Sequence, residues 1–354
     1  MLSGQQKEVK KIIFFLIAIL IIASLYFVGK KYIEIQIFKP YGIKGESVLV
    51  EIKPGMKVRD LASFLQKKKI VRGRILFLLG YNMFFKGKTI KAGEYKFELP
   101  ISLFDVLKKI TKGEIYLHEI TIPEGSTIDD IGKILEREGI LKADDFVRAS
   151  KNVELVSHFT DKANDLEGFL FPDTYFVPKG IPPEKILKIM VSRFKEKVGG
   201  YLDKVKEGFD FYSVLILASL IEKETGVDSE KPLVSSVFYN RLKRGMPLQC
   251  DPTVIYALKK EGKYQNILRK EDLSFPSPYN TYLHKGLPPG PICNPGIASI
   301  ESAINPARTD YLYFVSNGDG THTFSSDLNS HNRAVRNYIR KIRESKKENS
   351  IFYR

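Results

Sequence analysis

Two glutamates, Glu222 and Glu224, directly follow an apolar stretch and are the side chains best suited to proton transfer. The stretch, residues 214–221, is almost unbroken, and a helix that is apolar all round is a buried helix. Its charged end therefore emerges from a core. Gly226 is expected just past the helix end in a left-handed conformation, which puts Glu224 in the last turn. There the helix dipole and desolvation both raise a carboxyl pKa, and a carboxyl still protonated near neutral pH suits general acid catalysis.

The spacing of the two glutamates does not choose between them. Two residues apart on a helix of about 3.6 residues per turn, Glu222 and Glu224 point to opposite sides and cannot easily form a facing acid and nucleophile pair. Each has apolar residues one or two turns behind it. By spacing alone, an ordinary solvated helix end is the default interpretation of this Glu-Lys-Glu run.

Further polar residues that could bind a ligand lie downstream. Asn240 and Arg241 follow an apolar helical stretch and either face a cleft or cap the helix, with Arg241 alternatively pairing with Glu222 or Glu224. Two polar clusters carry amide, carboxylate and hydroxyl groups, which hydrogen-bond sugar hydroxyls and acetamido groups. They comprise Gln249, Asp251 and Thr253 in LQCDPT, and Asn280, Thr281 and Tyr282 in SPYNTY. Pro252 is expected to stiffen a loop there, and Asp-Pro makes a plain turn the default interpretation of Asp251.

Other kinds of catalytic site find little support. The chain has two cysteines, Cys250 and Cys293, and five scattered histidines, with no zinc-binding spacing. We interpret the cysteines as two unrelated small buried residues, although an extracytoplasmic location would allow a disulfide. His322 and His331 could join a Ser-His-Asp triad on paper, but no Gly-x-Ser-x-Gly elbow is present. No metal or cofactor is expected.

Several long blocks resemble one protein family. The segment ASLIEKETGVDSEKPLVSSVFYNRLKRGMPLQCDPTVIYAL is similar to the catalytic segment of the endolytic murein transglycosylases, the YceG-like family. Further similar blocks are LEGFLFPDTY at 166–175, SPYNTY at 277–282, GLPPGPICNPG at 286–296, and YLYFV followed by HTFSSDLNSHN within 311–332. The resemblance covers about residues 160–335, in long and ordered blocks.

The resemblance implies an activity and assigns its acid. By position, the family's catalytic acid is the second glutamate of Glu-Lys-Glu-Thr, Glu224, and Glu222 becomes a supporting residue that orients or balances the site. The implied reaction cuts the MurNAc–GlcNAc β-1,4 bond inside peptidoglycan strands and leaves 1,6-anhydro-MurNAc ends. The family also implies that nascent strands are terminated, with wall-synthesis enzymes as candidate partners.

Two alternative functions remain open. A muramidase would use water, with Asp251 or Glu222 as base or nucleophile, and would leave reducing ends. A non-catalytic glycan-binding scaffold would recruit wall-synthesis machinery and leave no new ends. The formal net charge of +15 calls for an anionic partner or surface, but no helix-turn-helix or RNA-binding motif supports a nucleic acid.

The N-terminus carries a candidate membrane anchor. Residues 12–29 contain no charge and are bracketed by lysines, and this length is near the minimum for spanning a bilayer. A cleaved signal peptide is the alternative, but the run does not end in a small-x-small pattern. We expect an uncleaved helix with residues 1–11 as a cytoplasmic tail. Lysines on both flanks decide the orientation only weakly, and the resemblance places the catalytic part outside the bacterial cytoplasmic membrane.

An internal repeat follows the anchor. VEIKPGMKVRDLASFLQKKKIV at 50–71 aligns with ITIPEGSTIDDIGKILEREGIL at 120–141, and each copy predicts a short strand, a turn at its glycine and an amphipathic helix. Ser126 is the expected cap of the second helix. A further strand and helix are expected between the copies. The region resembles the LysM-like part of the same family. This implies either binding of N-acetylglucosamine-containing glycan or a packing platform that sets the distance of the active site from the membrane.

These observations predict an α+β protein with a single transmembrane helix. We expect a linker at 30–47, a LysM-like repeat region at 48–155, and a mixed α+β catalytic domain at 156–340, with the catalytic glutamate at the end of a buried helix. A basic tail is expected at 341–354, where contact with lipid or acidic wall peptide is the alternative to plain solvation.

Overall fold

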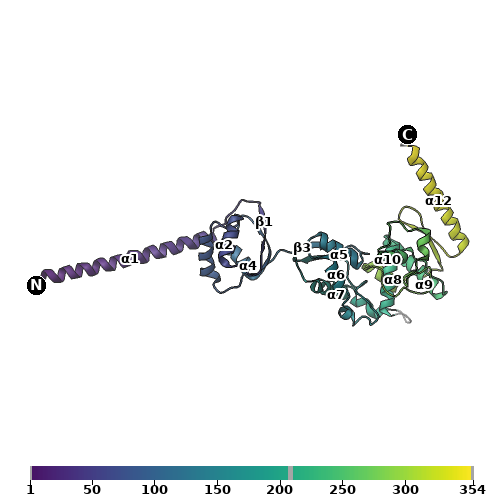
Figure 1. Cartoon of the computed structure of the whole chain (residues 1–354), viewed down its shortest axis with the longest axis horizontal. Helices are drawn as coiled ribbons and strands as arrows, with labels where there is room; N and C mark the ends of the chain where they lie inside the picture. Colours follow the sequence, from purple (N-terminus) through teal and green to yellow (C-terminus); the bar gives the residue numbers. More distant parts are fainter. Residues whose placement is uncertain (1, 206–209, 352–354) are drawn as a thin grey trace. The chain divides into compact units, whose positions relative to one another are not determined.

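The structure is a computed structural model that describes residues 2–205 and 210–351 (Figure 1). The chain divides into two compact units, Met1–His118 and Glu119–Arg354, here called unit 1 and unit 2. Each has a hydrophobic core of its own. Helices and short two-stranded sheets occur together in the described residues. The mixed α+β fold expected from the sequence is confirmed.

Helix α1 (Leu2–Phe38) contains one stretch, Glu8–Phe38, that is long and apolar enough to cross a membrane. This agrees with the expected N-terminal apolar helix. The helix continues into residues 30–47, which we expected to be a linker, because Ile33 and Ile37 lie one turn apart and pack against the core of unit 1. Ile37 is fully buried.

Unit 1 is built on a strand pair. β1 (Ser47–Ile52) runs antiparallel to β2 (Gly93–Glu98), with Ser47 opposite Glu98. Alternate side chains point to one face of this pair and are buried there. The elements that complete the unit are α2 (Val58–Lys67), α3 (Arg74–Gly80), a π-helical turn (Tyr81–Phe85) and α4 (Leu103–Lys112). The buried face collects Val50, Ile52, Tyr95 and Phe97 from the strands and Leu61, Leu65, Val106 and Ile110 from the helices.

The two copies of the repeat have the predicted local structure. The first forms β1 and α2, and the second forms β3 (His118–Thr121) and α5 (Ile128–Arg137), with Gly55 and Gly125 left-handed in the turns. The expected cap of α5 is wrong by one residue. Thr127 caps the helix through a reciprocal pair of hydrogen bonds with Asp130, while the Ser126 hydroxyl donates to the Pro123 carbonyl.

The two copies belong to different units. The buried residues Ile128, Ile131 and Leu135 of α5 join the core of unit 2, so the second copy contributes to the unit that contains Glu224. The sheet of β3 is completed by β4 (Thr174–Val177). The similarity of residues 48–155 to LysM modules, and the functional limits of the domains, stay predictions.

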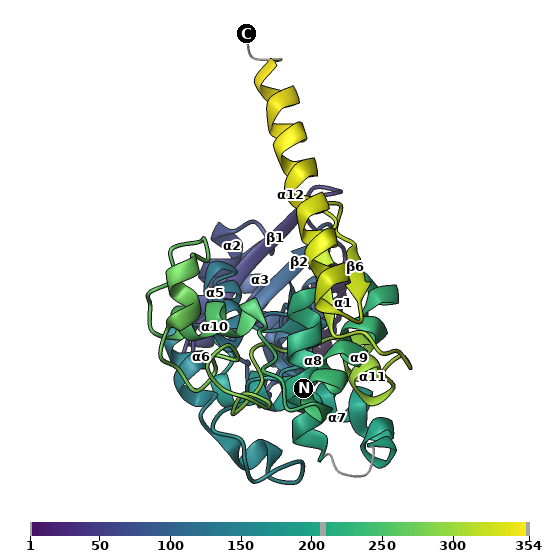
Figure 2. The same ribbon diagram turned by 90° about the vertical axis from the view of Figure 1, so that its right-hand side faces the viewer.

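Unit 2 is mostly helical. Its helices after α5 are α6 (Ala143–Ala149), η2 (Val153–Val156), α7 (Pro183–Val198), η3 (Gly199–Lys204), α8 (Phe211–Glu224), η4 (Asp228–Glu230), α9 (Lys231–Lys243), α10 (Asp251–Lys260), η5 (Lys270–Ser274), α11 (Ile297–Ile304) and α12 (Leu328–Ile351). β5 (Tyr313–Ser316) and β6 (His322–Ser325) form an antiparallel hairpin. α12 packs on this hairpin at its start and then projects away from the unit (Figure 2).

Helix α8 is the central element of unit 2. Ten of the eleven residues 211–221 are buried, Ser213 being the exception, and the helix lies beside α9 and α11 (Figure 2). Asp210 caps its start by accepting a hydrogen bond from the Ser213 amide at 2.8 Å. The buried helix predicted from the apolar run is therefore present, and it ends at Glu224.

Candidate active site at the end of helix α8

The backbone at the end of α8 differs from the expected cap. Thr225 leaves the helix in an extended conformation, with φ −142° and ψ 134°, and Gly226 is not among the left-handed glycines of the described chain. The Thr225 hydroxyl accepts a hydrogen bond from the Val227 amide at 3.1 Å. The threonine side chain therefore shapes the turn that we assigned to glycine, and Glu224 still lies in the last turn.

Glu224 is partly buried among groups from two other elements. Desolvation raises its pKa to about 7, and the Asp251 carboxylate pushes in the same direction. A hydrogen bond with the Cys250 thiol and the charge of Arg241 act the other way. The result is a carboxyl that changes protonation near neutral pH, which is the property that proton donation and recovery by one group require.

Glu222 faces a different part of unit 2. Its Oε2 accepts hydrogen bonds from the Gly296 amide at 3.0 Å and from the Ser299 hydroxyl at 2.6 Å, at the start of α11. The Lys231 ammonium lies 3.6 Å from the same oxygen, and both side chains are at most 8% exposed. Lys231 also pairs with Asp228 at 2.9 Å. Glu222 thus fixes the loop before α11 to the end of α8.

Arg241 is buried and connects two other segments of unit 2 through its hydrogen bonds. In the described part of the chain it forms no ion pair with Glu222 or Glu224; its guanidinium donates to the carbonyls of Leu312 at 2.7 Å and Leu248 at 2.9 Å. It also donates to Gln249 Oε1 at 3.2 Å. Desolvation lowers the Arg241 pKa, and the nearby Glu224 charge acts against this. The side chain holds the segment that leads to Cys250 and places a positive charge near Glu224.

Asp251 is the first residue of α10, so the loop expected at LQCDPT is wrong at this point. Pro252 lies in the first turn of the helix, where its missing N–H costs no hydrogen bond. The exposed Asp251 accepts a hydrogen bond from the Tyr282 hydroxyl at 2.5 Å. This pair brings the two predicted polar clusters together next to Glu224, whose charge raises the Tyr282 pKa after the larger effects of burial and Asp251.

The remaining predicted site residues form hydrogen bonds to other groups of the protein. The Asn240 amide donates to the carbonyls of Thr309 and Tyr311, at 3.0 and 2.9 Å. The buried Asn280 donates to the carbonyls of Leu273 and Phe275, at 3.0 and 2.8 Å. The buried Thr253 hydroxyl donates to the Cys250 carbonyl at 2.7 Å and shares a hydrogen bond with the hydroxyl of Thr281, also buried, at 3.0 Å. These contacts hold the loops around Glu224, and a direct substrate contact by any of these residues stays a prediction.

The sequence argument missed one central residue, Asn294. Its amide group donates to Ser126 O and Glu167 Oε1, both at 2.9 Å, and its carbonyl accepts from the Leu170 amide. It therefore joins the turn before α5 to the LEGFLFPDTY segment. Asn294 lies within GLPPGPICNPG, so the resemblance marked the block, but no spacing rule singles out this amide.

The same loop is fastened to α8 itself. The Ile292 amide donates to the Ser219 hydroxyl at 3.0 Å, and the Cys293 thiol donates to the Ser219 carbonyl at 3.3 Å. Cys250 and Cys293 are both free and buried, as the sequence interpretation held. Blocks that are more than seventy residues apart in the chain thus surround one helix end.

These features define a class of protein in which a carboxyl with a raised pKa lies at the end of a buried helix, surrounded by segments from distant parts of the chain. The model of the YceG-like family matches residues 50–337. A protein of Bacillus subtilis (strain 168) named endolytic murein transglycosylase is 36% identical over 311 residues, which are 83% of this chain and 85% of that protein. The chain belongs to the YceG-like family.

One further relative and one solved structure are also similar to this chain. An endolytic murein transglycosylase of Streptococcus pneumoniae serotype 2 (strain D39 / NCTC 7466) is 29% identical over 360 residues, covering 93% of this chain and 65% of that protein. The crystal structure of a yceG-like protein from Listeria monocytogenes is similar with a TM-score of 0.57 and 33% identity, covering 81% of this chain and 98% of that one.

Proposed function

We propose that this chain is a membrane-anchored endolytic lytic transglycosylase that cuts the MurNAc–GlcNAc β-1,4 bond inside peptidoglycan strands. Its curated relatives are named endolytic murein transglycosylases, and this supports a peptidoglycan-cleaving lyase. The observation that carries the mechanism is Glu224, whose pKa is raised to about 7 by burial at the end of α8.

In the proposed reaction Glu224 acts twice. Its protonated carboxyl gives a proton to the glycosidic oxygen as the bond from that oxygen to the MurNAc anomeric carbon breaks. The carboxylate then takes the proton of the MurNAc 6-hydroxyl, and O6 forms a new bond to the same anomeric carbon. No water is consumed, Glu224 regains its proton, and the strand ends in 1,6-anhydro-MurNAc. Because the nucleophile belongs to the substrate, proximity supplies part of the rate acceleration.

The surroundings of Glu224 fit a one-carboxyl mechanism. Ordinary glycosidases place two carboxyls about 5 to 9.5 Å apart to act together on one bond. Glu222 is occupied with Gly296, Ser299 and Lys231. We assign it to support, where it holds the loop before α11 against the end of α8. Asp251 is committed to the Tyr282 hydroxyl and is the remaining candidate for a second carboxyl.

The proposed location follows from α1 and the substrate. α1 is long and apolar enough to anchor the chain in a membrane. Peptidoglycan lies outside the cytoplasmic membrane, so units 1 and 2 belong on that side and residues 1–11 in the cytoplasm. Strands still being extended at the membrane are the substrate that an anchored enzyme reaches, which is consistent with termination of nascent strands.

The test is mass spectrometry of un-crosslinked glycan strands incubated with the full-length protein in detergent. Wild type should release internal fragments that end in 1,6-anhydro-MurNAc, and Glu224→Gln should release none while retaining the wild-type melting temperature. An acid–base group is worth about 10² to 10⁴ in rate, and here one group serves two steps. A Glu224→Gln protein that still cuts strands would exclude Glu224 as the acid.

The same experiment separates the alternatives. Reducing ends in place of anhydro ends would indicate a muramidase that uses water, and Asp251→Asn would then be the next variant. Intact strands that remain bound to the protein after long incubation would indicate a non-catalytic glycan-binding scaffold.

A further inference from the structure

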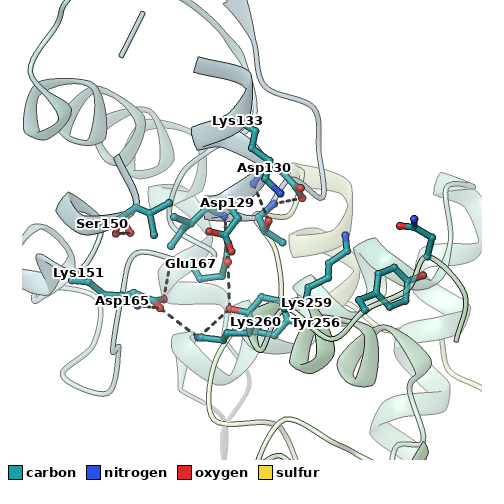
Figure 3. Close-up of a pocket in the computed structure, with 16 residues that line it drawn as sticks. Asp129, Asp130, Lys133, Ser150, Lys151, Asp165, Glu167, Tyr256, Lys259 and Lys260 are labelled. Atoms are coloured by element: carbon teal, nitrogen blue, oxygen red, sulfur yellow. Dashed lines mark hydrogen bonds and ion pairs between the residues drawn. The ribbon is translucent and has the colours of Figure 1, made fainter. Parts of the chain in front are cut away.

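Unit 2 contains a pocket that the proposed reaction does not use. It has a volume of about 450 Å³ and is lined by α5, the end of α6, the segment around Asp165 and Glu167, and the C-terminal part of α10 (Figure 3). Neither Glu224 nor Cys250 lines it. Its floor is Glu167, which is 4% exposed and accepts hydrogen bonds from the Ile128 amide and Asn294, so it is satisfied by the protein.

Ammonium and carboxyl groups line this pocket, and some of them are already paired; burial raises the pKa of Glu167 to about 8, so this carboxyl is mostly uncharged near pH 7. The ammonium groups belong to Lys133, Lys151, Lys259 and Lys260, and the carboxyls to Asp129, Asp130, Asp165 and Glu167. Asp165 holds Lys151 at 2.9 Å and Lys260 at 3.8 Å, and Asp130 completes the cap of α5. These paired groups form the walls of the pocket and are not free to bind a ligand.

Three charged groups remain available to a ligand. Lys133, Lys259 and Asp129 form no ion pair within the part of the chain that the structure describes, and all three are exposed. Lys133 comes from α5 and Lys259 from α10, on different walls of the pocket (Figure 3). The Lys259 ammonium lies 5.8 Å from the centre of the Tyr264 ring, which adds an aromatic surface.

This set of groups selects a class of ligand. Two free ammonium groups can each receive a carboxylate, and the free carboxylate can receive an ammonium. A polyanion would meet the carboxylates of Asp129, Asp130 and Asp165 on the same walls, and like charges in contact oppose binding. A neutral sugar would leave the lysines unpaired. A short peptide with two carboxylates and one ammonium matches all three groups.

Helix α10 connects the pocket to the candidate active site. Its first residue, Asp251, follows Cys250 and its last residue is Lys260, so one end lies at Glu224 and the other in the pocket. Ten helical residues span about 15 Å. An extended peptide of five residues reaches up to about 17 Å. A peptide attached to a sugar at Glu224 is therefore long enough to enter the pocket along α10.

We propose that this pocket binds a peptide stem of the peptidoglycan strand, with Lys133 and Lys259 holding its carboxylates and Asp129 its ammonium group. The proposal rests on the function proposed above, because it takes the strand as the substrate. It adds a second point of recognition on the same substrate and predicts that the enzyme distinguishes strands with peptides from bare glycan.

The binding test uses the full-length protein in detergent and the N-acetylated pentapeptide L-Ala-γ-D-Glu-L-Lys-D-Ala-D-Ala, which carries two carboxylates and one ammonium group. Isothermal titration calorimetry should detect binding to wild type. Lys133→Ala/Lys259→Ala should weaken it at least about tenfold, because each lost charged hydrogen bond is worth about that much. Asp129→Asn should weaken it less. Lys188→Ala, an exposed lysine outside the pocket, is the matched control and should bind as wild type does.

The cleavage test compares intact strands with strands whose peptides an amidase has removed. Wild type should cut intact strands faster, and Lys133→Ala/Lys259→Ala should lose this preference while still cutting bare glycan at the wild-type rate. Failure to bind the pentapeptide, or equal binding by the double variant, would overturn the pocket assignment even if strands are cut. Lysine-dependent binding without cleavage of either strand would uphold the pocket and reject the proposed function.

Discussion

The carboxyl of Glu224, the last residue of α8, shares a hydrogen bond with the thiol of Cys250, the residue just before α10. Cys250 is 1% exposed, and burial and the Glu224 charge both raise the pKa of its thiol. The thiol therefore stays protonated and can donate to the carboxylate. A thiol is a weak donor, so it stabilises the ionised glutamate only slightly.

The first prediction concerns the pH dependence of cleavage. The reaction begins with protonated Glu224, whose pKa is about 7, so the turnover rate should fall about tenfold per pH unit above that value. Below it, the rate should level off. The measurement is the rate of anhydro-end formation between pH 5 and 9 at saturating substrate. A rate that rises steadily up to pH 9 would contradict a protonated carboxyl as the starting form.

The second prediction concerns Cys250. In Cys250→Ser a hydroxyl replaces the thiol and donates more strongly to the carboxylate, so the pKa of Glu224 should fall. In Cys250→Ala no donor remains and the pKa should rise. The alkaline limb of the pH–rate profile should therefore move to lower pH in the first variant and to higher pH in the second. Shifts of the same sign in both variants would show that packing, and not the hydrogen bond, sets the profile.

The third prediction concerns the buried pair of Glu222 and Lys231. Removing one partner leaves a buried charge without its counter-charge, so Lys231→Met should lower the free energy of unfolding by about 3 to 5 kcal/mol. Glu222→Gln should cost less, because Lys231 keeps Asp228, and it should reduce cleavage less than Glu224→Gln does.

The control for this pair is the double variant. Glu222→Gln/Lys231→Met should be more stable than the sum of the two single losses by about 1 to 3 kcal/mol, because the two sites interact. Urea unfolding of all four proteins gives this coupling energy. Additive losses within about 0.5 kcal/mol would mean that the two residues act independently.

The fourth prediction concerns Arg241. Its guanidinium satisfies the carbonyls of Leu312 and Leu248, and each buried polar group left without a partner costs about 1 to 3 kcal/mol. Arg241→Ala should therefore lower the free energy of unfolding by about 3 kcal/mol or more. Arg244→Ala, three residues further along at the exposed end of α9, is the matched control and should change it by less than about 0.5 kcal/mol. Equal losses of unfolding free energy in the two variants would contradict the proposal that Arg241 holds these segments together.

Much of the local structure could be predicted from the sequence. The apolar run at 214–221 predicts a buried helix because burial on all sides leaves no polar stripe, and α8 is that helix. The repeat predicts a strand, a glycine turn and an amphipathic helix in each copy, because these signals span only a few residues. The charge-free run at 12–29 predicts the apolar helix at the N-terminus, because the whole signal lies in one continuous stretch of the sequence.

Local patterns failed where neighbouring residues could take the same role, or where one dipeptide suits two local structures. Thr127 in place of Ser126 caps α5, and Thr225 in place of Gly226 shapes the end of α8. Asp-Pro is typical of a turn, yet here it starts α10, because proline is also favoured in a first helical turn. Such choices differ by about 1 kcal/mol, which packing of the surrounding elements easily overrides.

The sequence by itself determined that the chain has an apolar N-terminal helix, a buried helix ending in Glu-Lys-Glu, and polar clusters downstream. Only the tertiary structure decided what each glutamate contacts. Glu222 meets Gly296, Ser299 and Lys231, while Glu224 meets Cys250 from the start of α10. A carboxyl pKa depends on burial and on charges from segments far apart in the chain, and spacing within one helix carries no information about those segments.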